Sequence, residues 1–441
     1  NTGKPPYRTP DQTGGWGGDH GTPQTVIALG DTMFCSWNAS EAGWGIIRTK
    51  LNGGKQWGSS SNARYMATDG ERLYYSNGRQ VKMLDVAEPR PLSLDNGVSR
   101  LTPPPGGDAE ANGVRGLAYD NNTVFVAYGE RDLIGVYDGT DGSLKDSWKV
   151  DSPGRMAIRP DGSLAVITGD RVVSISDGKV EAWLSTNLDA PVGIAVDAQG
   201  TAYVSNQGQL QNVSVFNADG QYVKSIGRKG GRPAMGRYDP QGMYQPGGIA
   251  LDARGRLWVA ENSTCPKRIS VWKVETGKNA DEFFGASSYF AYGYIDPANP
   301  DEIYAHNVLW EINWDDYTTE PKTTVWRASE PNMAPAPNFD AHTSGGGFRM
   351  VTTDKGRQFG WGGAGGSRGK VFYMRSDDLF QPFAGVINPW KDSGRFPGLQ
   401  EYKAKLNKQW DENRVAGHRR PRNQFWMDAN GRWHNEHGPF E

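Results

Sequence analysis

The feature that most constrains the fold of this chain is a segment that occurs twice. Residues 191–206 and 246–262 share a Gly-containing lead-in, an alternating apolar stretch, an Asp-x-x-Gly turn and a second stretch rich in aromatic and β-branched residues. Self-similarity at a period of roughly 40–55 residues is typical of repeat architectures, in which each repeat is one supersecondary unit. The repeat therefore predicts a stack of similar β-units.

Related but less regular segments extend this pattern along most of the chain. We delimit eight candidate units at about residues 24–57, 63–92, 114–148, 153–184, 191–226, 246–284, 291–327 and 346–385. Each alternates apolar and polar residues, as half-buried strands do, and Asp-Gly or Asn-Gly breaks supply the positive φ values of tight hairpins. One four-stranded sheet cannot bury both faces, so such sheets stack radially. The residue pattern of the repeat resembles that of the NHL family of β-propellers. This resemblance is at the level of the fold and covers most of residues 24–385.

We therefore expect an all-β fold, a β-propeller of four-stranded antiparallel blades. The count of units predicts eight blades, with seven as the alternative if the first unit completes the last. The expected domains are a Gly-rich lead-in (1–23), the NHL-like propeller (24–397) and a C-terminal helix and strand (398–441) packed on or closing the propeller.

The C-terminal region departs from the repeat. Leu399, Tyr402, Leu406 and Trp410 recur at helical spacing, which predicts one amphipathic helix. Residues 424–431 read as a further strand and turn, either the closing strand of the ring or the first strand of another part. We expect the chain to belong to a larger protein or assembly.

Composition and charge limit the possible partners. The formal net charge of −2 gives no global basic footprint, so nucleic acid is not an expected partner. The sequence has no run of 18 or more apolar residues, so no membrane span is predicted. The repeat type and the 16 tryptophans favour a secreted or periplasmic location. Cys35 and Cys265 fall in the first and sixth units, which are not neighbours in an eight-membered ring, so free thiols are expected.

Three arginines are candidates for a ligand site. When the units are aligned on their first strands, Arg64 and Arg115 share the position at the strand entrance, and Arg155 lies one residue further along. First strands line the central channel of a propeller, so these guanidinium groups converge near one mouth in this interpretation. Their planar forks suit carboxylate or sulfate. The alternative is that each arginine bonds carbonyls or an Asp of its own blade.

Histidines and loop tryptophans supply a second set of candidates. His20 and His342 precede units one and eight, which are neighbours if the ring closes as expected. With Asp19 they are candidates for a divalent metal site or for acid and base catalysis; the alternative is that they are surface-loop residues. Tryptophans in glycine-rich loops are candidates for stacking on sugar rings: Trp16, Trp44 and Trp361.

Two classes of function fit these features. The first is an extracytoplasmic binding or scaffold module that presents an Arg- and aromatic-lined channel mouth to an acidic carbohydrate or protein partner. The second is a metal-assisted polysaccharide lyase, or a related carbohydrate-active enzyme, that uses the same mouth for β-elimination on a uronate. Fold analogy does not choose between them.

Overall fold

The fold is described from a computed structural model. It describes mainly residues 21–38, 45–102, 113–233, 236–263 and 266–285, and after residue 285 chiefly the strands given below. The chain divides into two compact units, Asn1–Tyr289 with His306–Arg327, and Phe290–Ala305 with Ala328–Glu441. Among the described residues, no helix is long and apolar enough to cross a membrane.

The first unit contains six sheets of consecutive antiparallel strands, here called blades 1 to 6. Blades 1 to 3 are β1 (Pro23–Leu29), β2 (Thr32–Trp37), β3 (Ile46–Lys50) and β4 (Lys55–Ser59); β5 (Tyr65–Thr68), β6 (Arg72–Ser76) and β7 (Lys82–Asp85); and β8 (Val114–Asp120), β9 (Thr123–Tyr128), β10 (Leu133–Asp138) and β11 (Leu144–Lys149). A short 3-10 helix, η1 (Gly129–Arg131), joins β9 to β10. Blade 2 has three strands, and isolated bridges from Leu84 to Pro91 and from Lys82 to Arg100 continue its outer edge.

Blades 4 to 6 repeat the four-stranded pattern. They are β12 (Pro153–Ile158), β13 (Leu164–Thr168), β14 (Arg171–Ser176) and β15 (Lys179–Leu184); β16 (Pro191–Val196), β17 (Ala202–Asn206), β18 (Asn212–Phe216) and β19 (Tyr222–Ile226); and β21 (Pro246–Leu251), β22 (Arg256–Glu261), β23 (Arg268–Lys273) and β24 (Asn279–Phe284). The longer connection before blade 6 contains β20 (Gly236–Arg237), which pairs with β28 (Thr318–Thr324), and β28 pairs with β27 (Val308–Asn313).

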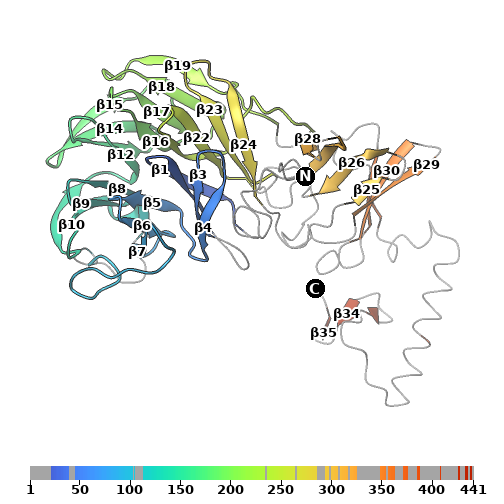
Figure 1. The fold of residues 1–441 in the computed structure, drawn as a ribbon, viewed down its shortest axis with the longest axis horizontal. Coiled ribbons are helices and arrows are strands. Elements are labelled where there is room, and N and C mark those ends of the chain that lie inside the picture. The colour runs from blue at the N-terminus through green and yellow to red at the C-terminus, as the bar shows by residue number, and fades with distance from the viewer. Residues whose placement is uncertain are drawn as a thin grey trace. The chain divides into compact units, whose positions relative to one another are not determined.

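The predicted all-β propeller is confirmed by the arrangement of the first strands. They are neighbours in cyclic order, β1, β5, β8, β12, β16 and β21, and β1 lies against β21 (Figure 1). The predicted hairpin glycines also have positive φ, with Gly200 at 82° and Gly255 at 69°. All eight predicted repeat units contain β-strands. The ring in this unit is formed by six sheets, and one further four-stranded antiparallel sheet belongs to the second unit.

The contact between blades 1 and 6 explains the closure. A Cβ on Gly248 would overlap Thr25, so β21 and β1 approach too closely for another sheet to stand between them. The side chain of Arg256 donates to the Leu51 carbonyl at 2.9 Å, and that of Asn262 donates to the Pro23 carbonyl at 2.5 Å. Buried residues of both blades form one apolar cluster, including Val26, Cys35, Trp37, Leu51, Trp258, Val271 and Phe283.

Cys35 belongs to this cluster and is a free, fully buried cysteine. Its expected free thiol is confirmed, although the reason given for it fails because blades 1 and 6 are neighbours. Burial raises the pKa of this thiol well above its usual value, which keeps it protonated and unreactive. Cys265 lies outside the described residues.

The second unit is also built from strands. Its elements are β25 (Tyr294–Asp296) and β26 (Asn299–Ala305), the four-stranded sheet β29 (Phe348–Thr353), β30 (Gly356–Gly362), β31 (Val371–Arg375) and β32 (Gly385–Ile387), and the small sheet β33 (Trp426–Met427), β34 (Trp433–Asn435) and β35 (Gly438–Pro439). The strand expected near residues 424–431 is β33, and it pairs with β34. Of the expected C-terminal helix only Lys408, which is helical, is described.

Candidate functional site

The first strands of the six blades begin on one face of the ring, which we call the mouth face. At these entrances the first strands of neighbouring blades contact each other closely. A Cβ on Gly116 would overlap the Gly154 carbonyl, and a Cβ on Gly193 would overlap the Gly247 carbonyl. Five of these entrances contain a β-bulge, which inserts an extra residue and re-aims side chains. The Asp-x-x-Gly hairpins lie at the other end of the first strands, on what we call the hairpin face.

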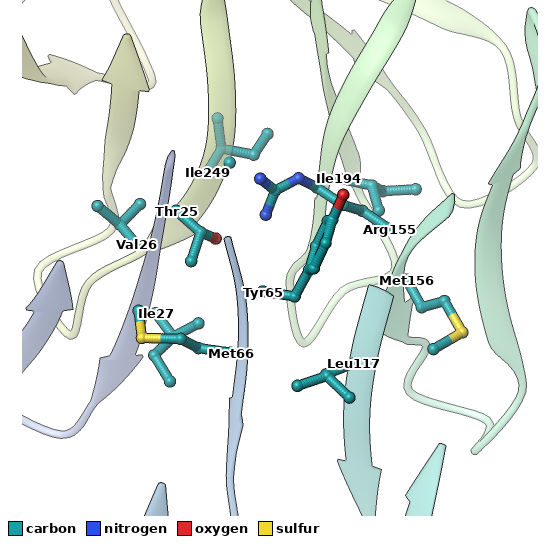
Figure 2. Close-up of a pocket in the computed structure, with 11 residues that line it drawn as sticks. Thr25, Val26, Ile27, Tyr65, Met66, Leu117, Arg155, Met156, Ile194 and Ile249 are labelled. Carbon is teal, nitrogen blue, oxygen red and sulfur yellow. The ribbon is translucent and has the colours of Figure 1, made fainter. Parts of the chain in front are cut away.

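The central channel narrows immediately below the mouth face. Each first strand contributes at least one apolar side chain to its wall, and these are Val26, Ile27, Met66, Leu117, Met156, Ile194 and Ile249 (Figure 2). The cavity between them measures about 60 Å³. That volume accommodates water molecules but not a sugar ring.

Arg155 closes the upper part of this channel. Its side chain extends from β12 and donates to the carbonyl of Gln24, across the channel in blade 1, at 2.8 Å. The guanidinium carbon lies 5.0 Å from the ring centre of Tyr65 in blade 2, a cation–π contact visible in Figure 2. Burial lowers the pKa of Arg155 to about 10, with Tyr65 opposing the shift. Arg155 thus links three blades, and its charge is used within the fold.

The other two predicted arginines have different surroundings. Arg115 forms an ion pair with Glu130 of its own blade, with side-chain exposures of 39% and 64%. An exposed pair of this kind is weak, so a ligand can compete for the arginine. Arg64 is exposed and makes no hydrogen bond or ion pair of its side chain with any residue that the structure describes. The three arginines therefore share the mouth face but not one set of partners.

The remaining predicted site residues fall where side chains are not described. Trp16, Asp19, His20, Trp44 and His342 lie outside the described residues, and Trp361 lies in β30 with only its backbone described. No group of three or more His, Cys, Asp or Glu side chains suited to a metal occurs in the described part of the chain. The proposed metal site and the catalytic roles of His20 and His342 remain predictions.

A groove on blade 2 was not anticipated from the sequence. It measures about 420 Å³ and is lined by two segments that meet at the mouth face: Ser60, Ser61, Asn62, Tyr75, Asn77, Arg79, Gln80 and Lys82. The first segment leads into β5 and the second joins β6 to β7. We call this set the blade-2 groove. Its signal in the sequence is the pairing of a Ser-Ser-Asn lead-in with a polar, cationic β6–β7 turn, which an alignment of first strands alone does not reveal.

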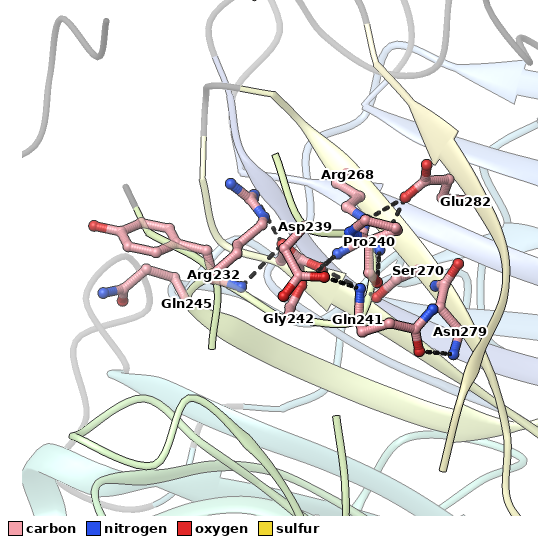
Figure 3. A network of polar contacts seen from close by, with 12 residues as sticks. Arg232, Asp239, Pro240, Gln241, Gly242, Gln245, Arg268, Ser270, Asn279 and Glu282 are labelled. Atoms are coloured by element: carbon pink, nitrogen blue, oxygen red, sulfur yellow. Dashed lines mark hydrogen bonds and ion pairs between the residues drawn. The ribbon is translucent and has the colours of Figure 1, made fainter. Parts of the chain in front are cut away.

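A second polar cluster lies on blade 6 and anchors the long connection before it. Buried Glu261 accepts from Arg268 at 2.7 Å and from Arg232 at 3.0 Å. Arg268 also donates to Glu282 and to the backbone carbonyls of Pro240 and Gly242 (Figure 3). Burial acts to lower the pKa of Arg268, but the carboxylates of Glu261 and Glu282 raise it overall. This cluster fixes Arg232 and residues 240–242 of that connection to the blade, a structural role.

Comparisons with known proteins give limited similarity. No protein-family model matches the sequence, and no curated protein matches it. Among solved structures, the chain is similar to a catalytically inactive virginiamycin B lyase from Staphylococcus aureus with quinupristin, at 12% identity and a TM-score of 0.41, over 70% of this chain and 96% of that one. It is also similar to a structural genomics protein of unknown function from Bacteroides thetaiotaomicron, at 12% identity and a TM-score of 0.42, over 61% and 72%. Similarities of this size assign no activity.

Proposed function

We propose that this chain is an extracytoplasmic binding or scaffold propeller, part of a larger protein, whose mouth face holds an acidic carbohydrate or an acidic protein partner. The propeller fold supports a binding or scaffold role in general terms, because radial blades present loops on a rigid frame. The acidic partner is the finer part of the proposal. NHL-type repeats remain part of this hypothesis.

One observation carries the preference for an acidic partner. Exposed Arg64 lies at the mouth face without a partner among the described residues, next to a groove whose described lining has two further cations and no carboxylate. Unpaired guanidinium groups at a concave surface attract carboxylates and sulfates, which they bind through paired hydrogen bonds. The closed channel leaves this rim as the accessible part of the mouth.

The test is binding of acidic and neutral polysaccharides to the whole chain. We expect polyuronate or sulfated polysaccharide to bind, and neutral polysaccharide of similar length to bind much more weakly. The double variant Arg64→Ala/Arg115→Ala should lose about tenfold or more in affinity, because a hydrogen bond to a charged group contributes about 1.5–3 kcal/mol. Isothermal titration at two salt concentrations measures both effects.

Arg90→Ala is the matched control. Arg90 is 63% exposed but pairs with Asp85, where β7 ends at the hairpin face. Its removal should leave affinity unchanged. If the wild-type chain binds no acidic polymer, or binds neutral ones equally well, the proposal of an acidic partner fails.

A further inference from the structure

The blade-2 groove is the part of the mouth face whose chemistry defines a ligand most closely. We infer that it binds one or two residues of a uronate-containing saccharide, an inference that rests on the proposed function and makes it specific. Its volume of about 420 Å³ lies within the range of about 300–1,000 Å³ that is usual for small-molecule sites. The groove is therefore large enough for sugar rings, unlike the central channel.

The lining favours a hydroxylated ligand over an apolar one. Apart from Tyr75, every described lining residue is polar or charged, with hydroxyl groups on Ser60 and Ser61 and carboxamides on Asn62, Asn77 and Gln80. Tyr75 is itself 9% exposed, and its hydroxyl bonds Ser61 at 3.2 Å. A peptide partner usually needs an exposed aromatic or aliphatic anchor, and the lining has none. Hydroxyls and carboxamides both donate and accept, as sugar hydroxyl groups require.

The charge of the groove selects for an acid. Arg79 and Lys82 are exposed and form no ion pair with any described residue. None of the described residues that line the groove is a carboxylate that could neutralise them. The fork of Arg79 can hold a carboxylate through two parallel hydrogen bonds, and Lys82 adds a second positive charge.

The pairing of Lys82 gives an independent indication of function. An isolated antiparallel bridge joins Lys82 to Arg100, so two cations stand directly opposite each other at the edge of blade 2. Like charges in that position destabilise a sheet. Folding alone therefore disfavours this pair, whereas a bound anion beside it relieves the repulsion.

The experiment compares groove variants in titrations with a digalacturonate. The wild type should bind it more tightly than a neutral galactose disaccharide and more tightly than inorganic sulfate at equal ionic strength. Arg79→Ala should lower the affinity about tenfold or more, and Arg79→Lys should recover only part of it because the fork is lost. Arg90→Ala should bind like the wild type.

Lys82→Gln separates a ligand role from a structural one. If Lys82 serves the ligand, this variant binds digalacturonate more weakly while its Tm stays equal to that of the wild type or rises. A fall in Tm together with unchanged affinity would show that Lys82 serves the fold, and would overturn the inference.

The outcomes also distinguish this inference from the proposed function. If acidic polysaccharide binds but Arg79→Ala and Lys82→Gln leave the affinity unchanged, the groove is not the site and the proposed function stands. Equal binding of sulfate and digalacturonate would identify a simple anion site and overturn the saccharide assignment. If no acidic ligand binds the wild type, both proposals fail.

Discussion

The two faces of the ring use the same residue type for different purposes. On the hairpin face, Arg256 bonds the Asp252 carboxylate at 2.8 Å and the Leu51 carbonyl of the next blade at 2.9 Å. Arg72 does the same in blade 2, with Asp69 at 2.6 Å and the Gly139 carbonyl of blade 3 at 2.6 Å. On the mouth face, Arg64 and Arg79 have no such partners among the described residues.

The difference lies in a carboxylate that precedes the arginine at the hairpin. Asp252 also accepts from the backbone of residues 254 and 256 and from the indole of Trp258, so it organises the turn and holds the arginine at once. No acidic residue of the turn plays this part beside Arg64, which follows Ser61, Asn62 and Ala63. An arginine that bonds the aspartate of its own hairpin turn is therefore interpreted as structural, and Arg64 and Arg79, which have neither a local acid nor another described partner, are interpreted as candidates for binding.

The largest effect should come from removing the hairpin carboxylate. Asp252→Ala leaves the buried indole N–H of Trp258 without its acceptor and removes the carboxylate partner of Arg256, which keeps its hydrogen bond to Leu51; Asp252 itself is only 5% exposed. Loss of such partners costs about 1–3 kcal/mol for each buried group, so we expect the free energy of unfolding to fall by about 3 kcal/mol. Denaturant titration measures it.

Arg64→Ala is the opposing variant. It removes an exposed side chain without a described partner, so the free energy of unfolding should change by less than about 0.5 kcal/mol. Equal destabilisation by the two variants would abolish the distinction between the faces.

Two glycines, one on each face of the ring, allow the same comparison to be tested. Gly193 at the mouth face has the Gly247 carbonyl where a Cβ would stand, whereas Gly255 at the hairpin face has open space around it but a φ of 69°. Gly193→Ala should therefore lower the free energy of unfolding by about 2 kcal/mol through overlap with backbone. Gly255→Ala should cost about 1 kcal/mol through backbone strain alone. Thermal unfolding of both variants tests the order, and a larger loss for Gly255→Ala would contradict it.

The repeats made the blades predictable from the sequence, but not the closure of the ring. The duplicated segments form neighbouring blades, joined where the Ser205 hydroxyl donates to the Gly247 carbonyl at 2.6 Å. The alternation and the turn glycines that define them are local signals. Closure after six blades depends on how closely β1 approaches β21, which is set by Gly248 and Thr25, far apart in the sequence.

The candidate site was predictable in part for the same reason. Alignment of the repeats placed Arg64, Arg115 and Arg155 at first-strand entrances, and all three do lie there. Their partners come from other loops or blades: Glu130 for Arg115, and Gln24 with Tyr65 for Arg155. Such contacts carry no local signal, and neither does the meeting of two segments in the blade-2 groove.

The smallest effect should come from Arg155, the mouth arginine that the fold already uses. Its hydrogen bond to Gln24 and its contact with Tyr65 stabilise the ring, but its charge is partly buried with no carboxylate among its partners in the described part of the chain, and burial lowers its pKa to about 10. A base whose pKa is lowered by folding disfavours the folded state below the folded pKa, and this penalty shrinks as the pH rises above about 10 toward the pKa of the unfolded chain. Arg155→Met should therefore unfold within about 1 kcal/mol of the wild type at pH 7, since well-packed apolar replacement of a buried charge is often neutral. Denaturant titrations at pH 7, 9 and 10.5 should show the free energy of unfolding of the wild type rising relative to that of this variant at the highest pH. A loss of several kcal/mol at pH 7 would instead place Arg155 with the structural arginines of the hairpin face.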